Sequence, residues 1–291
     1  MSIKEKGYSH WDGELKQKKF PWWPITRFGI VSTFRRKFFK LVFLVSLLPS
    51  IVYFAGIYIS ERMDDFKFMI NETQQMDFLH ITPKYFNTYF TNEFLLFWIV
   101  IILIFCGAGL ISEDFKYNSL QLYFSRPLRK SQYFLGKASI IFFFLFLITL
   151  VPGLLLIILK LIFSGSFAFI AKYHWLPLSV IGYSVLVTWF FTSYALFLSS
   201  LSKNKRYVAV LIFGIYLFSN IFYKIFYGIF RNQHFALVSL EANLKQIGAL
   251  FFNQRLPYNI HWIYSLLIII GFSLLALVAV KRKVRGVEVV K

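Results

Sequence analysis

The run FLLFWIVIILIFCGAGLI, residues 94–111, is the stretch of this sequence that most restricts the fold. Its 18 residues include no Asp, Glu, Lys or Arg, and most of them are Leu, Ile, Val or Phe. The hydrocarbon core of a bilayer is about 30 Å thick, and a helix of roughly 20 apolar residues crosses it. The run therefore predicts a membrane-spanning helix.

Five further stretches have a similar composition, so an all-α membrane protein with six spans is expected. In chain order the six are residues 41–60, 94–111, 138–163, 176–201, 207–230 and 260–280. Pro49 and Pro152 lie within spans and are expected to kink them, whereas Pro177 stands at a helix start, where proline is tolerated. The first span follows a long basic segment and lacks a small-residue cleavage site, which argues against a cleavable signal peptide.

The composition excludes several classes of protein. Of the 291 residues, 58% are hydrophobic, 21% are aromatic and only 15% are charged. A soluble domain this apolar would expose large sticky patches, and a disordered chain would be poor in aromatic residues. A protein that binds nucleic acid could carry the net charge of +19, but it would not need such apolar runs. Because Cys106 is the single cysteine, a disulfide framework and a cysteine-based metal site are also excluded.

The basic residues predict the orientation in the membrane. Of the 32 Lys and Arg residues, 23 lie in residues 1–40, 112–137, 202–206 and 281–291, on one side of the six spans. The first loop on the other side is net acidic. By the positive-inside rule, both termini face the cytoplasm, and the protein lies in the cell's inner or plasma membrane. A single transmembrane domain is predicted, with a basic segment (1–40), a six-span bundle (41–280) and a basic tail (281–291).

Residues 21–40 predict a basic amphipathic helix in the cytoplasmic membrane interface. Apolar side chains recur at three- and four-residue spacing, arginines occupy other faces, and tryptophans stand at the start. The basic faces are expected to favour anionic lipid headgroups. The alternative is a basic flank that only sets topology. The residues assigned to this helix are Trp22, Trp23, Arg27, Ile30, Phe34 and Phe38.

Residues 231–259, before the sixth span, show helical periodicity and few charges. The segment is too short and too broken for a seventh span. It is therefore expected to be a re-entrant or interfacial helical segment on the outer side.

The loop at residues 112–137, SEDFKYNSLQLYFSRPLRKSQYFLGK, carries the clearest motif. Ser112 and the acidic pair after it form a helix start, with acids at the positive end of the dipole. An Asn-Ser-Leu step at 118–120, a Ser-Arg-Pro-Leu-Arg turn at 125–129 and Tyr-Phe-Leu-Gly-Lys at 133–137 follow. This order resembles the signature region of ABC-2 type transporter permeases. Asn118 stands where glycine is usual, and asparagine tolerates the left-handed backbone such a turn requires.

The resemblance implies a transport subunit that is driven by a separate cytoplasmic ABC ATPase and is expected to work as an exporter. It also implies a dimer, either of two copies of this chain or with a related permease. It also implies that a coupling helix in the loop at 112–137 contacts the ATPase, with a second contact in the loop before the fifth span. An accessory protein that binds the outer loops is a further expected partner. The implied coupling residues are Glu113, Asp114, Phe115, Tyr117, Ser119 and Leu120; those of the second contact are Lys203, Asn204, Lys205 and Arg206; those of the motif turn are Ser125, Pro127, Gly136 and Lys137.

The energy source is expected outside this chain. The sequence has no G-x-x-x-x-G-K-[ST] phosphate-binding loop. Ion-driven transport would normally place acids or histidines inside the spans, and these residues are expected only in loops and at span ends. ATP and magnesium are therefore assigned to the partner ATPase. No catalytic residue, metal site or cofactor is expected in this chain.

Three alternatives stay open at this point. A non-transporting structural or regulatory subunit would share the topology and the charge bias. An intramembrane enzyme would need paired Asp, a Ser–His pair or H-E-x-x-H at membrane depth, and the sequence offers none of these. A channel would need a charged ring or a filter-like loop. The sequence does not indicate a substrate.

Overall fold

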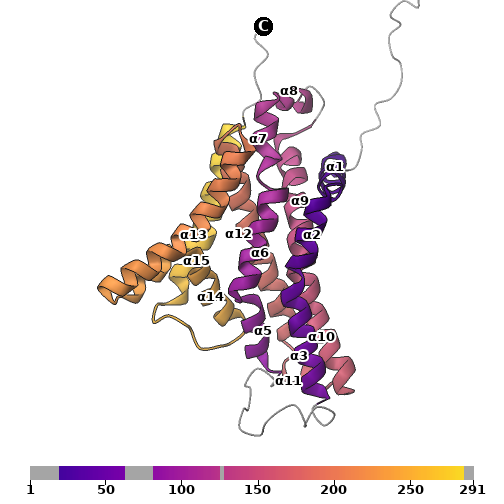
Figure 1. Ribbon diagram of the computed structural model, residues 1–291, viewed down its shortest axis with the longest axis vertical. Coiled ribbons are helices and arrows are strands. Elements are labelled where there is room, and N and C mark those ends of the chain that lie inside the picture. The colour runs from indigo at the N-terminus through magenta and orange to yellow at the C-terminus, as the bar shows by residue number, and fades with distance from the viewer. Residues whose placement is uncertain (1–19, 63–80, 125–127, 285–291) are drawn as a thin grey trace, which may run out of the picture.

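The computed structural model describes residues 20–62, 81–124 and 128–284, and every regular element in them is a helix (Figure 1). Six helical stretches are long and apolar enough to cross a membrane, which confirms the predicted spans. Expectations for residues 1–19, 63–80, 125–127 and 285–291 fall outside the described residues. The six stretches are Lys37–Glu61, Pro83–Lys116, Lys130–Ser164, Leu176–Leu201, Lys205–Phe230 and Trp262–Lys283.

The first three spans are interrupted helices, and the last three are continuous. The first consists of α2 (Lys37–Ser46) and α3 (Leu48–Glu61). The second consists of α5 (Pro83–Phe90), α6 (Glu93–Cys106) and α7 (Gly109–Lys116). The third consists of α9 (Lys130–Ile148) and α10 (Leu150–Ser164). The others are α12 (Leu176–Leu201), α13 (Lys205–Phe230) and α15 (Trp262–Lys283), with α8 (Ser119–Phe124) and α11 (Ala168–Lys172) in connections.

Proline accounts for two of the interruptions. Pro49 and Pro152 stand near the starts of α3 and α10, at the places where kinks are predicted. Proline has no N–H to give to the carbonyl four residues earlier, so it leaves an acceptor free. For Pro152 that acceptor is the carbonyl of Ile148, and the Tyr89 hydroxyl donates to it at 3.3 Å. A side chain of the second span thus replaces the missing backbone bond in the third.

Helix α12 forms the centre of the bundle. It packs against α9, α10, α13, α14 and α15, and about two thirds of its most apolar window is buried. Small hydroxyl residues such as Ser184 and Thr188 let neighbouring helices approach closely. Aromatic side chains, among them Tyr183, Phe190 and Tyr194, fill the remaining space. This arrangement supplies the rigid frame on which the outer helices are mounted.

Helices α13 and α15 leave apolar side chains on the surface. Phe218, Phe222, Ile225 and Ile229 of α13 are all exposed at helical spacing. In water such a continuous patch would drive aggregation. This face is therefore expected to contact lipid or a second membrane helix.

The N-terminal helix is shorter than the sequence predicts. Helix α1 covers Trp23–Phe34, the chain is extended at Arg36, and α2 then begins the first span, so Phe38 belongs to that span. Ile30 and Phe34 pack towards the bundle, whereas Phe28 and Trp23 are exposed. Arg27 is also exposed, and Trp22 is half-buried.

The predicted helical segment before the sixth span is present. It consists of the 3-10 helix η3 (Gln233–Val238) and α14 (Leu240–Phe251). Helix α14 packs among α12, α13 and α15. Gln246 of α14 donates to the carbonyls of Tyr258 and Ile260 at 3.2 and 2.7 Å and so satisfies irregular backbone that leads to α15.

The segments assigned to the cytoplasm lie at one end of the bundle. In Figure 1, α1, α7, α8, the start of α13 and the end of α15 all lie towards the top, and α5 and α11 lie towards the bottom. This grouping is what the distribution of basic residues predicts.

Candidate functional site

Helix α7, the last helix of the second span, and the connecting helix α8 form a helical elbow (Figure 1). Gly107 lies at the break after α6, and a Cβ there would come within 2.8 Å of the Leu103 carbonyl oxygen and 3.0 Å of Ala195 Cβ. The first N–H groups of a helix have no partner within it. Here the Ser199 hydroxyl of α12 accepts from the N–H groups of Ile111 and Ser112 at 2.9 and 3.1 Å. Helix α7 is thus capped by a residue far away in the sequence.

Asn118 makes the turn between α7 and α8. Its φ is 53°, in the left-handed region that favours glycine. Asparagine adopts this region more readily than most residues. The expectation that Asn118 can replace glycine here is confirmed.

Asp114 fixes the elbow to the third span. Its Oδ2 lies 2.7 Å from Nζ of Lys137 and accepts from the Tyr133 hydroxyl at 2.5 Å. The ammonium group of Lys137 also lies over the rings of Tyr123 and Tyr133, 5.5 Å from each centroid. Burial raises the pKa of Tyr123 on α8 to about 12, and the negative charge of Asp114 contributes to that increase. The Asp114–Lys137 pair therefore joins α7 to α9, and the Lys137 ammonium group also contacts α8.

Glu113 connects the elbow to the fifth span. Its Oε1 lies 2.6 Å from Nζ of Lys205, in the first turn of α13. Lys205 is exposed and Glu113 is half-buried, with 52% and 36% of their side chains accessible, so this pair contributes little to stability. Asn204 caps α13 by accepting from the N–H of Arg206 at 3.0 Å, and Lys203 is exposed beside it. The predicted second contact is thus the start of α13, adjacent to the elbow.

The predicted coupling residues differ in their exposure. Asp114 and Leu120 are buried, Glu113, Phe115 and Ser119 are half-buried, and Tyr117 is 66% exposed. The most exposed apolar side chain of the elbow is Leu122, at 73%, which is not among the predicted coupling residues. In the motif turn, Ser125 and Pro127 lie outside the described residues. Gly136 permits close packing of α9 on α1, since a Cβ there would lie 3.0 Å from the Trp22 carbonyl oxygen.

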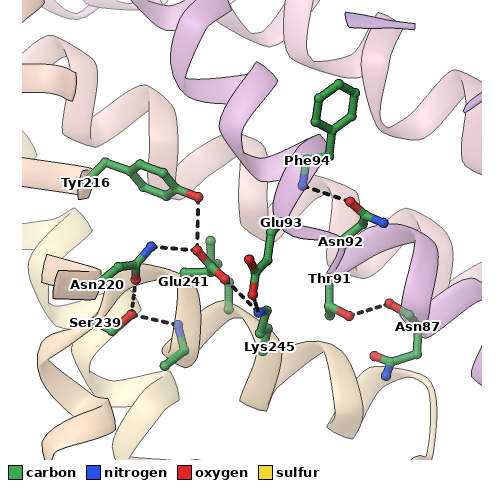
Figure 2. Close-up of polar contacts among 12 residues, drawn as sticks. Asn87, Thr91, Asn92, Glu93, Phe94, Tyr216, Asn220, Ser239, Glu241 and Lys245 are labelled. Atoms are coloured by element: carbon green, nitrogen blue, oxygen red, sulfur yellow. Dashed lines mark hydrogen bonds and ion pairs between the residues drawn. The ribbon is translucent and has the colours of Figure 1, made fainter. Parts of the chain in front are cut away.

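A second polar cluster lies between α6, α13 and α14 (Figure 2). Lys245 Nζ lies 2.6 Å from Glu241 Oε1 and 2.7 Å from Glu93 Oε1. The other carboxylate oxygen of Glu241 accepts from the Tyr216 hydroxyl at 3.2 Å and from Asn220 Nδ2 at 2.5 Å. Ser239, which caps α14, donates to the amide oxygen of Asn220. The cluster joins the second and fifth spans through α14.

This cluster shows that an acid outside the spans can still be buried. Glu93 is the first residue of α6 and is exposed, whereas Glu241 of α14 is buried against Tyr216 and Asn220 of the fifth span. A sequence signal existed, because Tyr216–Asn220 and Glu241–Lys245 are both polar pairs at i,i+4 spacing and therefore share helix faces. Their proximity depends on the packing of α14, which spacing does not specify.

The described residues contain no group of three or more His, Cys, Asp or Glu side chains that could hold a metal ion.

In comparisons with known proteins, the family described as ABC-2 family transporter protein matches residues 32–251, which is more than half of the chain. No curated protein matches the sequence significantly.

Proposed function

Because the chain belongs to the ABC-2 family of transporter proteins, we propose that it is the membrane-spanning permease of an ATP-driven exporter. Membership in the family makes the chain a membrane transport subunit. We further propose that the chain exports its substrate and that a cytoplasmic ABC ATPase, which binds ATP and magnesium, drives it. A homodimer or a heterodimer with a related permease completes the proposed transporter.

The elbow of α7 and α8 is the observation that carries the proposal. Its helix α8 lies at the top of Figure 1, outside the spans and at the end of the bundle rich in basic residues. It is held by Asp114 to the third span and by Glu113 to the fifth. A rigid element with such ties can pass a displacement on its outer side to two spans at once. Coupling of ATP hydrolysis to transport requires such a connection.

The burial of the elbow residues divides the proposed roles. Tyr117 and Leu122, both exposed, would make the direct contact with the ATPase, supported by the half-buried Phe115 and Ser119. Exposed aromatic and apolar residues surrounded by polar ones suit a docking patch. Asp114 and Leu120 would instead hold the elbow in shape. Lys203 and Arg206, at the start of α13, would form the rim of the contact.

We also propose a dimer and an accessory protein. The exposed apolar face of α13, with Phe218 and Phe222, suits a second membrane subunit as well as lipid. An accessory protein at the outer loops is proposed from the acidic character of residues 61–93.

Cross-linking tests the proposed contact directly. Cys106 is the only cysteine and is buried, so a Leu122→Cys variant presents a single accessible thiol. When the chain is expressed with the ABC ATPase encoded nearest to it, the thiol should cross-link to the ATPase. Leu178→Cys, at the opposite end and equally exposed at 73%, is the control and should not cross-link. Failure of Leu122→Cys together with an ATPase rate independent of this chain would favour a structural subunit.

A further inference from the structure

An open groove of about 380 Å³ lies beside the elbow, where α1, α6, α7, α9 and α13 meet. Its walls include Arg36 after α1, Lys137 near the start of the third span, and Arg206 at the start of the fifth. Because these residues stand at the ends of spans, the groove lies at the level of one membrane interface.

The groove is positively charged, and part of that charge is uncompensated. Four basic and two acidic side chains line it. Lys137 and Lys205 are paired with Asp114 and Glu113, which leaves two positive charges. These belong to Arg36 and Arg206, both exposed, and neither has a carboxylate partner within the described residues. The groove therefore offers two guanidinium groups to an anion.

Most of the remaining lining is apolar, and its polar members are Ser32, Thr33 and Tyr123. Phe28 of α1 is 74% exposed, and Ile104, Phe105 and Ala209 are half-buried along α6 and α13. From the start of α13 at Arg206 towards the interior of the bundle, the lining changes from basic to apolar. A phospholipid has the same order of chemistry, with a charged headgroup followed by acyl chains.

We propose that this groove binds an anionic phospholipid from the surrounding leaflet. Arg36 and Arg206 contact the phosphate, and an acyl chain lies against Phe105 and Ala209. Guanidinium groups match phosphate oxygens in geometry and charge. The negative surface potential of anionic headgroups also attracts basic side chains near the membrane. The bound lipid fills the space between α1 and α13. The site does not depend on the identity of the ATPase or of the transported substrate.

Native mass spectrometry of the purified full chain tests this proposal. The protein is loaded from micelles with phosphatidylglycerol or with phosphatidylcholine of the same acyl chains. Wild type should retain phosphatidylglycerol at collision energies that remove phosphatidylcholine. Arg36→Gln with Arg206→Gln should lower that retention about tenfold or more, and a factor of ten corresponds to a loss of about 1.4 kcal/mol.

Two further variants separate a built site from general surface attraction. Arg35→Gln with Lys203→Gln removes the same charge from exposed neighbours that do not line the groove, and should bind like wild type. Ala209→Phe narrows the apolar wall without changing charge and should weaken retention. Equal retention of both lipids by wild type would overturn the proposal. So would an equal loss in the two double variants. Thermal unfolding in phosphatidylcholine micelles, where no variant should differ from wild type, checks the fold.

Discussion

Asp114 of α7 and Lys137 of α9 form an ion pair in which 2.7 Å separates Oδ2 from Nζ. The side chains are only 11% and 9% exposed, respectively, so neither charge is fully hydrated. The Tyr133 hydroxyl donates to the same oxygen of Asp114 at 2.5 Å. Burial makes the pair costly to break, because the remaining partner keeps an uncompensated charge. Separating these groups therefore carries a large free-energy cost, and the pair holds the elbow to the third span.

Breaking this pair should destabilise the protein strongly. Asp114→Asn leaves Lys137 charged and buried, and Lys137→Met leaves Asp114 in the same state. Each should lower the free energy of unfolding by about 3 kcal/mol. The double variant should lose less than the sum of the two, by about 1–3 kcal/mol. Chemical denaturation in micelles measures this double-mutant cycle, and strict additivity would contradict the assignment.

Leu122→Ala should weaken coupling to the ATPase without unfolding the permease. The side chain is 73% exposed, so its truncation removes docking area and little core packing. If Leu122 is an anchor of the interface, the affinity for the ATPase should fall by about tenfold or more. Binding and stimulated ATP hydrolysis are measured with both proteins reconstituted. Leu178→Ala, equally exposed at the opposite end, should leave both quantities unchanged.

Ser199→Ala should destabilise the break between α6 and α7. The hydroxyl accepts from two N–H groups of α7 and donates to the Ala108 carbonyl at 2.9 Å. Loss of a helix cap costs about 1–2 kcal/mol. Ser200→Ala is a matched control, because the buried Ser200 hydroxyl donates only within its own helix, to Phe197. Thermal unfolding of the two variants should differ; equal midpoints would remove the capping role.

The six spans could be predicted from sequence because each depends on local composition. An apolar run of sufficient length crosses a bilayer wherever it occurs in the chain. Pro49 and Pro152 likewise act on the helices that contain them. The predicted end of the interfacial helix at residue 40 is wrong, because the local composition of residues 37–40 suits the first span as well as an interfacial helix. In the structure α1 packs on α9 and ends at Phe34, and the extended Arg36 separates it from α2.

The contacts at the elbow could not be predicted, because they join distant residues. The acidic pair at 113–114 reads as a helix start from sequence alone. In the structure its two carboxylates point to different spans, Glu113 to Lys205 and Asp114 to Lys137. Burial of Leu120 and exposure of Leu122 depend equally on how α8 rests on α7. Spacing places residues on a helix face, but it does not say which face the neighbouring element covers.

The cluster around Glu241 provides the last prediction, and its two carboxylates form an internal comparison. Lys245 contacts both Glu93 and Glu241 at similar distances, but Glu93 is 69% exposed and Glu241 is 12% exposed. An exposed ion pair is worth about 1 kcal/mol or less. Glu93→Gln should therefore have a small effect on stability. Lys245→Met should cost several times more, because it leaves the buried Glu241 carboxylate with only Tyr216 and Asn220 as partners.

Replacing both partners resolves whether the charge or the shape of this cluster matters. Glu241→Gln combined with Lys245→Met removes both charges, and Gln can still accept from Tyr216 and Asn220. The double variant should recover most of the stability that Lys245→Met alone loses. Unfolding midpoints of Lys245→Met, of the double variant and of Glu93→Gln give the comparison. If Glu93→Gln and Lys245→Met were equally mild, the cluster would behave as a solvated surface pair, and α14 would not depend on it for attachment to the fifth span.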